Sequence, residues 1–121
     1  MTRSFLVLGG TGDLTGRLLL PGLAELVDAG VLAEPLEVLA LSQENWSDDE
    51  YRAWARERLA EHAAHVPEAS RERLVAGLGY RHGDVTVAAD LRAGIERAGG
   101  IPVIYLALPN TVFLPALEAL A

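Results

Sequence analysis

The sequence contains no cysteine, so disulfide bonds and thiolate metal sites are excluded. It has no apolar run near the roughly 20 residues that a membrane-spanning helix needs. Residues 1–4 lead directly into an expected strand and do not have the pattern of a signal peptide. Basic residues are scarce, with 10 against 17 acidic ones and a net charge of −7, which argues against sequence-independent binding of nucleic acid. These absences predict an acidic, soluble, cytoplasmic protein without membrane or nucleic-acid partners.

Short apolar runs alternate with helix-like segments along the 121 residues, whose apolar share of 50% is enough to fill a core although only 6% are aromatic. Strands are expected at residues 5–8, 36–41, 80–82 and 101–108. Helices are expected at residues 13–29, 47–65, 67–74 and 86–98, and from residue 110 onward. This alternation predicts an α/β fold of the Rossmann type, with a parallel sheet of about four strands in the order 3-2-1-4 and helices on both faces.

Individual residues mark the ends of these helices. Pro21 lies inside the first helix and predicts a kink or two helical pieces, and Gly30 predicts its end. Ser47 and Glu50 form a capping box that opens the second helix. The last helix has no ending signal in the sequence. We therefore expect residues 1–121 to be a partial dinucleotide-binding domain, incomplete at its C-terminus and without a substrate domain.

A glycine-rich turn joins the first strand to the first helix in the stretch FLVLGGTGDLTGRLLLP. Gly9, Gly10 and Gly12 permit a tight turn without Cβ atoms, and Thr11 adds a hydroxyl group. The free N–H groups and the positive dipole end of the following helix attract a phosphate. Asp13 fits the first helical turn, where an acid is favourable, and needs no catalytic role. The pattern indicates a pyrophosphate site, with an ordinary tight strand-to-helix turn as the alternative.

The run GGTGDLTGRLLLP resembles the N-terminal signature of the glucose-6-phosphate dehydrogenase family, which reads G-[AG]-[ST]-G-D-L, then a basic pair, then Leu-x-Pro. Four later segments resemble further landmarks of this family in the same order. They are residues 28–32, 45–51, 83–85 and 105–113. The resemblance covers essentially the whole chain and implies the NAD(P)-binding part of such a dehydrogenase.

The resemblance also implies a set of cofactor-binding residues, all at the carboxyl ends of expected strands, where open α/β sheets bind ligands. The implied pyrophosphate residues are Gly9, Gly10, Thr11, Gly12, Asp13 and Leu14. Ser42 and Gln43 follow the second strand, and Asp84 and Val85 would border the adenine side. The residues beside the nicotinamide half would be Leu106, Ala107, Leu108 and Pro109. A buried strand that ends in a turn is an equal interpretation of this last segment.

The resemblance implies NADP as the cofactor, but the residues after the second strand leave NAD open. The family carries an arginine there that pairs with the 2′-phosphate, whereas this chain has Gln43 between Ser42 and Glu44. A glutamine hydrogen-bonds either sugar and brings no charge, and an NAD site favours an acid at this place. Arg52 is either a replacement for the missing cation or a solvated surface arginine.

No catalytic or metal-binding residue is expected in this chain. The family's R-I-D-H-Y-L-G-K segment, which binds the substrate and supplies a histidine base, has no match. Leu18, interpreted as helix packing, replaces a family lysine near the reaction site, and His62 and His65 lack a third metal ligand. In the complete family enzyme the histidine removes the proton of the anomeric hydroxyl, while hydride passes from C1 of glucose 6-phosphate to the nicotinamide and gives 6-phosphogluconolactone. The sugar-phosphate substrate and a homo-oligomeric assembly are expected only for that complete enzyme.

Two other functions stay open. A short-chain dehydrogenase or nucleotide-sugar epimerase also opens with Gly-Gly-Thr-Gly after its first strand. Such enzymes use a Tyr-x-x-x-Lys pair, which none of Tyr51, Tyr80 and Tyr105 forms. A non-catalytic nucleotide-binding domain is the second alternative, and Leu18 and Gln43 support it.

Overall fold

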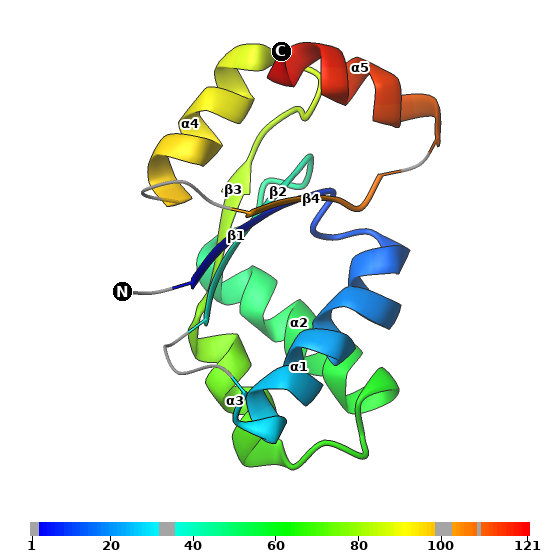
Figure 1. Ribbon diagram of the computed structural model, residues 1–121, viewed down its shortest axis with the longest axis vertical. Coiled ribbons are helices and arrows are strands. Elements are labelled where there is room, and N and C mark those ends of the chain that lie inside the picture. The colour runs from blue at the N-terminus through cyan, green and yellow to red at the C-terminus, as the bar shows by residue number, and fades with distance from the viewer. Residues whose placement is uncertain (1–2, 32–35, 99–102, 109) are drawn as a thin grey trace.

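The computed structural model describes residues 3–31, 36–98, 103–108 and 110–121, and Figure 1 shows their arrangement. Within this part of the chain, four parallel strands form one sheet in the order β3-β2-β1-β4. They are β1 (Arg3–Leu8), β2 (Leu36–Ser42), β3 (Leu78–His82) and β4 (Val103–Leu106). The predicted order 3-2-1-4 is confirmed, and the register places Leu6 of β1 between Leu39 and Ile104.

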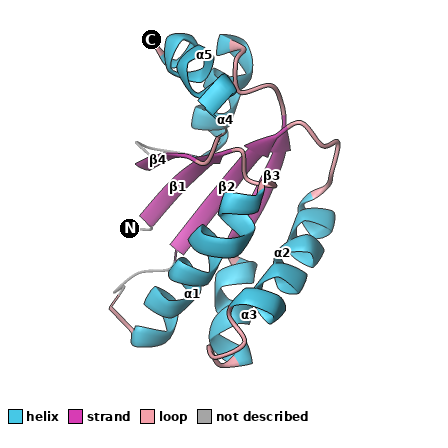
Figure 2. Cartoon of the chain, turned by 90° about the vertical axis from the view of Figure 1, so that its right-hand side faces the viewer, coloured by secondary structure: helices cyan, strands magenta, loops and turns pink. Residues whose placement is uncertain are grey.

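Helices cover both faces of the sheet, as predicted (Figure 2). They are α1 (Leu20–Ala29), α2 (Asp48–His62), α3 (Glu68–Ala76), α4 (Ala88–Ala98) and α5 (Asn110–Leu120), with a short π-helix, η1 (Thr15–Leu19), before α1. The helices α1, α2 and α3 lie on one face of the sheet, and α4 and α5 lie on the other. Among the described residues, no helix has both the length and the apolar character needed to cross a membrane.

The central strands are buried from both sides, which explains the unbroken apolar runs in the sequence. Val7 and Ala40 belong to the core under α1, α2 and α3. Leu6, Leu8 and Leu41 belong to the core under α4 and α5. Because successive side chains of a strand point to opposite faces, each central strand contributes to both cores.

The predicted helix ends are largely confirmed. The Ser47 side chain accepts a hydrogen bond from the Glu50 N–H, and the Glu50 carboxylate accepts one from the Ser47 N–H, each at 3.1 Å. The predicted first helix divides into η1 and α1, which follow one another without a break, and Pro21 lies in the first turn of α1. Gly30 ends α1 in the left-handed conformation with φ 68°.

Other boundaries differ from the prediction. Helix α4 begins at Ala88, two residues late, because the Asp84 carboxylate accepts hydrogen bonds from the N–H and the hydroxyl of Thr86 and so forms a turn before the helix. Strand β3 begins two residues early, at Leu78. Residues 101–102, predicted to open the last strand, lie outside the described residues.

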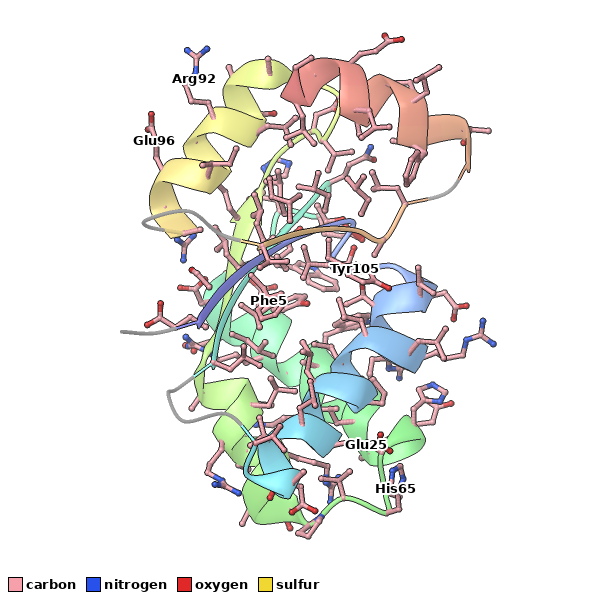
Figure 3. The ribbon with its side chains drawn as sticks, viewed as in Figure 1. Phe5, Glu25, His65, Arg92, Glu96 and Tyr105 are labelled. Atoms are coloured by element: carbon pink, nitrogen blue, oxygen red, sulfur yellow. The ribbon has the colours of Figure 1, made fainter. Side chains whose placement is uncertain are left out.

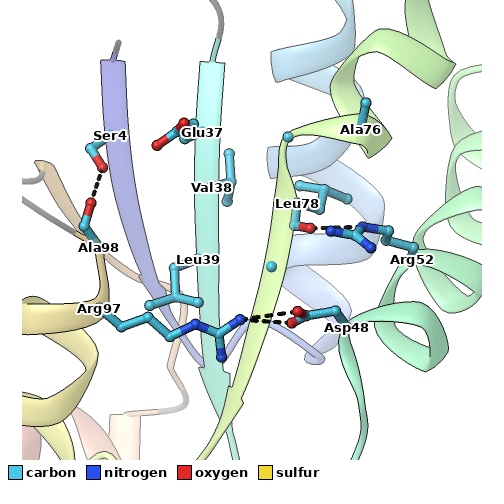
Figure 4. A pocket seen from close by; sticks show the side chains of 12 residues that line it. Ser4, Glu37, Val38, Leu39, Asp48, Arg52, Ala76, Leu78, Arg97 and Ala98 are labelled. Carbon is cyan, nitrogen blue, oxygen red and sulfur yellow. Dashed lines mark hydrogen bonds and ion pairs between the residues drawn. The ribbon is translucent and has the colours of Figure 1, made fainter. Parts of the chain in front are cut away.

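Side chains cover the open edge of β3, one of the two edge strands of the sheet (Figure 4). Asp48 accepts a hydrogen bond from the Tyr80 N–H at 2.7 Å, and Arg97 donates to the Tyr80 carbonyl. Arg97 also forms an ion pair with Asp48 at 2.9 Å, and Arg52 donates to the Leu78 carbonyl at 2.9 Å. These contacts satisfy backbone groups that an edge strand otherwise presents to other chains.

The edge contacts make the stability of the fold depend on the charge of Asp48. Partial burial raises the pKa of the Asp48 carboxyl, but the Tyr80 N–H and the Arg97 guanidinium outweigh it, so the net pKa lies below its ordinary value of 3.8. A lowered pKa stabilises the folded state above the ordinary value, and this contribution disappears as the pH falls below it. At neutral pH it is expected to be about 1 kcal/mol or less, because the Asp48 and Arg97 side chains are 39% and 41% exposed.

Asp48→Asn is therefore expected to lower the free energy of unfolding at about pH 7 and to have a smaller effect at about pH 3. Urea unfolding at both pH values measures this difference. The matched control is Asp49→Asn, which removes the same charge from a neighbouring side chain that is 93% exposed. A pH dependence that is the same in both variants would contradict the role of Asp48.

Candidate functional site

The loops that follow the strands surround a hollow of about 470 Å³ at the carboxyl edge of the sheet. Its lining residues are Gly9, Thr11, Gly12, Ser42, Gln43, Glu44, Val85, Ala107, Leu108 and Val112. A second hollow of about 370 Å³ shares Gln43, and its other lining residues are His82, Gly83, Asp84 and Asp90. Most of the predicted cofactor-binding residues thus lie together at the edge where parallel sheets bind ligands.

The other predicted residues that the structure describes do not line the hollows. Gly10 lies beneath the turn, against β2. Asp13 and Leu14 are exposed at the start of the following helix, and Leu106 ends β4. Pro109 lies outside the described residues. A direct contact between these residues and a cofactor stays a prediction.

Two of the three glycines are required by the turn itself. Gly9 has φ +82°, and a Cβ there would lie 2.4 Å from the Ala107 carbonyl oxygen. A Cβ at Gly10 would lie 2.3 Å from the Ala40 Cβ. The N–H groups of both glycines donate to the Leu41 carbonyl, at 2.9 and 3.4 Å. The turn therefore needs these glycines whether or not a ligand binds.

Gly12 is less tightly enclosed than Gly9 and Gly10. A Cβ at Gly12 would lie 3.3 Å from the Gly9 carbonyl oxygen, a closer approach than usual but looser than at the other two glycines, and Gly12 lines the hollow. The next N–H groups, those of Asp13 and Leu14, open a helix, and N–H groups of a first turn have no partner within the helix. Gly12 has no side chain that could stand between these donors and the hollow that it lines.

Tyr51 of α2 holds the glycine turn from beneath. Its hydroxyl donates to the Gly10 carbonyl at 2.8 Å, and the Thr15 hydroxyl donates to the Gly9 carbonyl at 3.1 Å. Both side chains are fully buried. Burial, and to a smaller extent the neighbouring Tyr80, raises the pKa of Tyr51, so its hydroxyl stays a donor. No sequence pattern indicates this contact, because Tyr51 and Gly10 are 41 residues apart.

Three side chains form a chain of hydrogen bonds at the edge of the hollow. The Thr11 hydroxyl donates to the Glu44 carboxylate oxygens at 2.8 and 2.9 Å and lies 2.8 Å from the Ser42 hydroxyl. Because the single Thr11 hydroxyl proton points to Glu44, Ser42 must donate to Thr11. Sequence reasoning treated Glu44 only as a neighbour of Gln43 and missed it as a site residue. An acid shortly after the second strand was the signal that could have found it.

Four aromatic rings support the loop after β2. Trp46, Tyr51, Trp54 and Tyr80 pack with ring centroids 5.2 to 6.2 Å apart. The Tyr80 hydroxyl donates to the Glu44 carbonyl at 2.6 Å. Burial, and then the Glu44 carboxylate, raises the pKa of Tyr80 to about 12, so this hydroxyl also stays protonated. The cluster therefore fixes the backbone from which Glu44 extends.

The loop after β3 is tied to its neighbours on the predicted adenine side. The Gly83 N–H donates to the Ser42 carbonyl, and the Asp84 N–H donates to the Asp90 carboxylate, both at 2.8 Å. Hydrogen bonds from the Thr86 hydroxyl and N–H lower the pKa of Asp84. The Asp84 carboxylate is therefore held at the turn before α4, at one side of the second hollow.

One of the two interpretations of Arg52 is wrong, and so is the packing interpretation of Leu18. Arg52 does not replace the missing cation, because it binds the Leu78 carbonyl at the start of β3, away from the carboxyl ends of the strands. Leu18 is not packed in the helix interface, because its side chain is 62% exposed. His62 and His65 have separate partners. The His65 Nε2 lies 2.6 Å from the Glu25 Oε1 (Figure 3), and the His62 Nε2 lies 3.8 Å from the Oε1 of Glu61, its neighbour in α2.

A parallel sheet wound in this order, with a glycine turn after β1 and hollows at its carboxyl edge, defines a Rossmann-like NAD(P)-binding domain. The amino-acid sequence matches the family described as glucose-6-phosphate dehydrogenase, NAD binding domain, over residues 6–121. The chain therefore belongs to the glucose-6-phosphate dehydrogenase family. The resemblance seen in its motifs is confirmed, and the match decides against the short-chain dehydrogenase alternative.

Similar proteins are dehydrogenases of that name. Glucose-6-phosphate 1-dehydrogenase of Rhizobium meliloti is 38% identical over 78 residues, which are 63% of this chain and 16% of that protein. Glucose-6-phosphate 1-dehydrogenase 1 of Mycobacterium bovis is 31% identical over 117 residues, which are 95% of this chain and 24% of that protein. The crystal structure of glucose-6-phosphate 1-dehydrogenase from Mycobacterium avium has a TM-score of 0.83 and 26% identity, and the match covers 99% of this chain and 26% of that one. The chain thus spans only about a quarter, or less, of the length of these relatives.

Proposed function

We propose that this chain binds NAD(P) along the carboxyl edge of its sheet. The observation that carries the proposal is the single hollow that residues from four separate segments line together. Gly12 and the helix that follows it would hold the pyrophosphate, because the N–H groups and the dipole of that helix favour an anion. Val85 contributes to the adenine side, and Ala107 and Leu108 provide an apolar wall beside the nicotinamide half.

For the complete protein we propose the activity of a glucose-6-phosphate 1-dehydrogenase. Membership of the family and relatives of that name over 95% of the chain support it. When bound, the nicotinamide would supply the redox chemistry as the hydride acceptor for C1 of the sugar phosphate. Residues of this chain bind and orient the cofactor. Because the family's substrate and histidine segment has no match here, the chain alone is expected to be inactive.

The choice between the two cofactors depends on the residues after β2. The family resemblance favours NADP, whereas the exposed and uncharged Gln43 also serves NAD. The sugar-phosphate substrate, a homo-oligomeric assembly and a cytoplasmic location of the complete protein are predictions from the sequence and from the family.

Gly12→Val tests the proposed binding. We expect it to weaken NAD(P) binding by about tenfold or more, because the added side chain fills the path to the helix N–H groups. Calorimetric titration of the dinucleotides measures the effect. The matched control is Gly22→Val in α1, where a Cβ meets no atom within 4 Å. Circular dichroism confirms that both variants are folded. Equal affinity of the two variants would contradict the assigned pyrophosphate site.

A further inference from the structure

Glu44 stands where a dinucleotide-binding sheet contacts the adenosine ribose. In general this position holds an acid that accepts hydrogen bonds from the ribose of NAD, or an arginine that accommodates the 2′-phosphate of NADP. Glu44 lines the larger hollow with Ser42 and Gln43, and its carboxylate lies 2.8 Å from the Thr11 hydroxyl. It is thus held between the glycine turn and β2, beside the proposed pyrophosphate position.

The hydrogen bonds around Glu44 leave its carboxylate able to accept more. Ser42 donates to Thr11 and Thr11 donates to Glu44, so the chain of donors ends at Glu44. A carboxylate has about four lone-pair sites, more than Thr11 occupies. Tyr80 fixes the Glu44 backbone through the carbonyl, not through the carboxylate. A ribose hydroxyl is a donor that suits this acceptor, whereas a phosphate is an anion that it repels.

The described residues that line the hollows include no arginine that could pair with a 2′-phosphate. The sequence contains no lysine, so arginine is the strong cation available. Arg81 of β3 lines neither hollow. Arg17 forms an ion pair within its own helix at 2.7 Å, and Arg52 and Arg97 take part in the edge contacts of β3. Arg92 points away from the sheet on the outer side of α4 (Figure 3).

We propose that Glu44 determines the cofactor and that it selects NAD over NADP. It accepts a hydrogen bond from the adenosine ribose and repels the 2′-phosphate. Asp84 and Asp90, which line the adjoining hollow, add negative charge on the same side. The inference rests on the proposed dinucleotide binding and reverses the cofactor that the family resemblance implies.

Calorimetric titration of the 121-residue chain with NAD and with NADP tests the inference. We expect the wild-type chain to bind NAD about tenfold or more tightly than NADP at low ionic strength. Glu44→Gln keeps an acceptor for Thr11 and removes the charge, so it should lose most of this preference. Glu44→Arg should reverse it. Raising the ionic strength from about 0.01 M to about 1 M should narrow the wild-type preference, because salt screens the repulsion.

The matched control is Glu37→Gln, which makes the same charge change on an exposed side chain near the start of β2. It should leave the ratio of the two affinities unchanged. If the wild-type chain binds both dinucleotides equally, or binds NADP more tightly, the inference about Glu44 is wrong but the proposed dinucleotide binding stands. The same holds if Glu44→Gln leaves the ratio of the NAD and NADP affinities unchanged. Binding of neither dinucleotide overturns the proposed function together with the inference.

Discussion

Gly9→Ala is expected to lower the free energy of unfolding by about 3 kcal/mol, from about 1 kcal/mol of left-handed backbone strain and about 2 kcal/mol of overpacking. The strain arises because Gly9 has φ +82°. The overpacking arises because the new Cβ would lie 2.4 Å from the Ala107 carbonyl oxygen and 2.9 Å from the Leu108 side chain. Both neighbours belong to the segment after β4, so the substitution would separate the glycine turn from that segment. Urea unfolding followed by tryptophan fluorescence measures the loss.

Gly30→Ala isolates the backbone part of this effect. Gly30 also has a positive φ, +68°, but a Cβ there meets no atom within 4 Å. It should therefore cost only about 1 kcal/mol, the strain of the left-handed conformation. The difference between the free energies of unfolding of the two variants measures how tightly the glycine turn packs against the end of β4. Equal losses would show that the turn does not depend on this packing.

The arrangement of the sheet could be predicted from the sequence because its signals are local. Unbroken apolar runs such as residues 5–8 mark strands that are buried on both faces, and Ser47 with Glu50 marks the start of a helix. Right-handed crossovers then allow few strand orders, and the observed order is the expected one. The start of α4 was predicted less well, because Asp84 and Thr86 compete for it with a turn of their own.

The candidate site could be predicted only where it depends on the backbone. Residues at the carboxyl ends of parallel strands must lie together, so Gly12, Ser42 and Val85 line one hollow as expected. Arg52 does not serve as the replacement cation, one of its two interpretations, because a crossover helix runs back toward the amino ends of the strands and each turn of α2 leads away from the site. The contact of Glu44 with the glycine turn depends on the direction of a side chain in a loop, and no spacing rule gives that direction.

Tyr51→Ala is expected to lower the free energy of unfolding by about 4 kcal/mol, because it empties a large, fully buried site. Tyr51 has an exposed fraction of 0% and packs between Trp54 and Tyr80, with ring centroids 5.5 and 5.2 Å away. Its removal takes away both ring contacts and the hydrogen bond to the Gly10 carbonyl. Thermal and urea unfolding measure the loss.

Tyr51→Phe separates the hydrogen bond from the packing. It keeps the ring and leaves the Gly10 carbonyl without its donor, at a cost of about 2 kcal/mol for an unsatisfied buried acceptor. The matched control is Tyr105→Phe on β4, which removes the same atom from a side chain that is 38% exposed and should change stability by less than about 0.5 kcal/mol. If Tyr51→Phe lowered the free energy of unfolding as little as this control does, the hydroxyl would not hold the glycine turn. The turn would then depend on the steric fit of Gly9 and Gly10 and on the hydrogen bonds that Thr15 and Leu41 make with it.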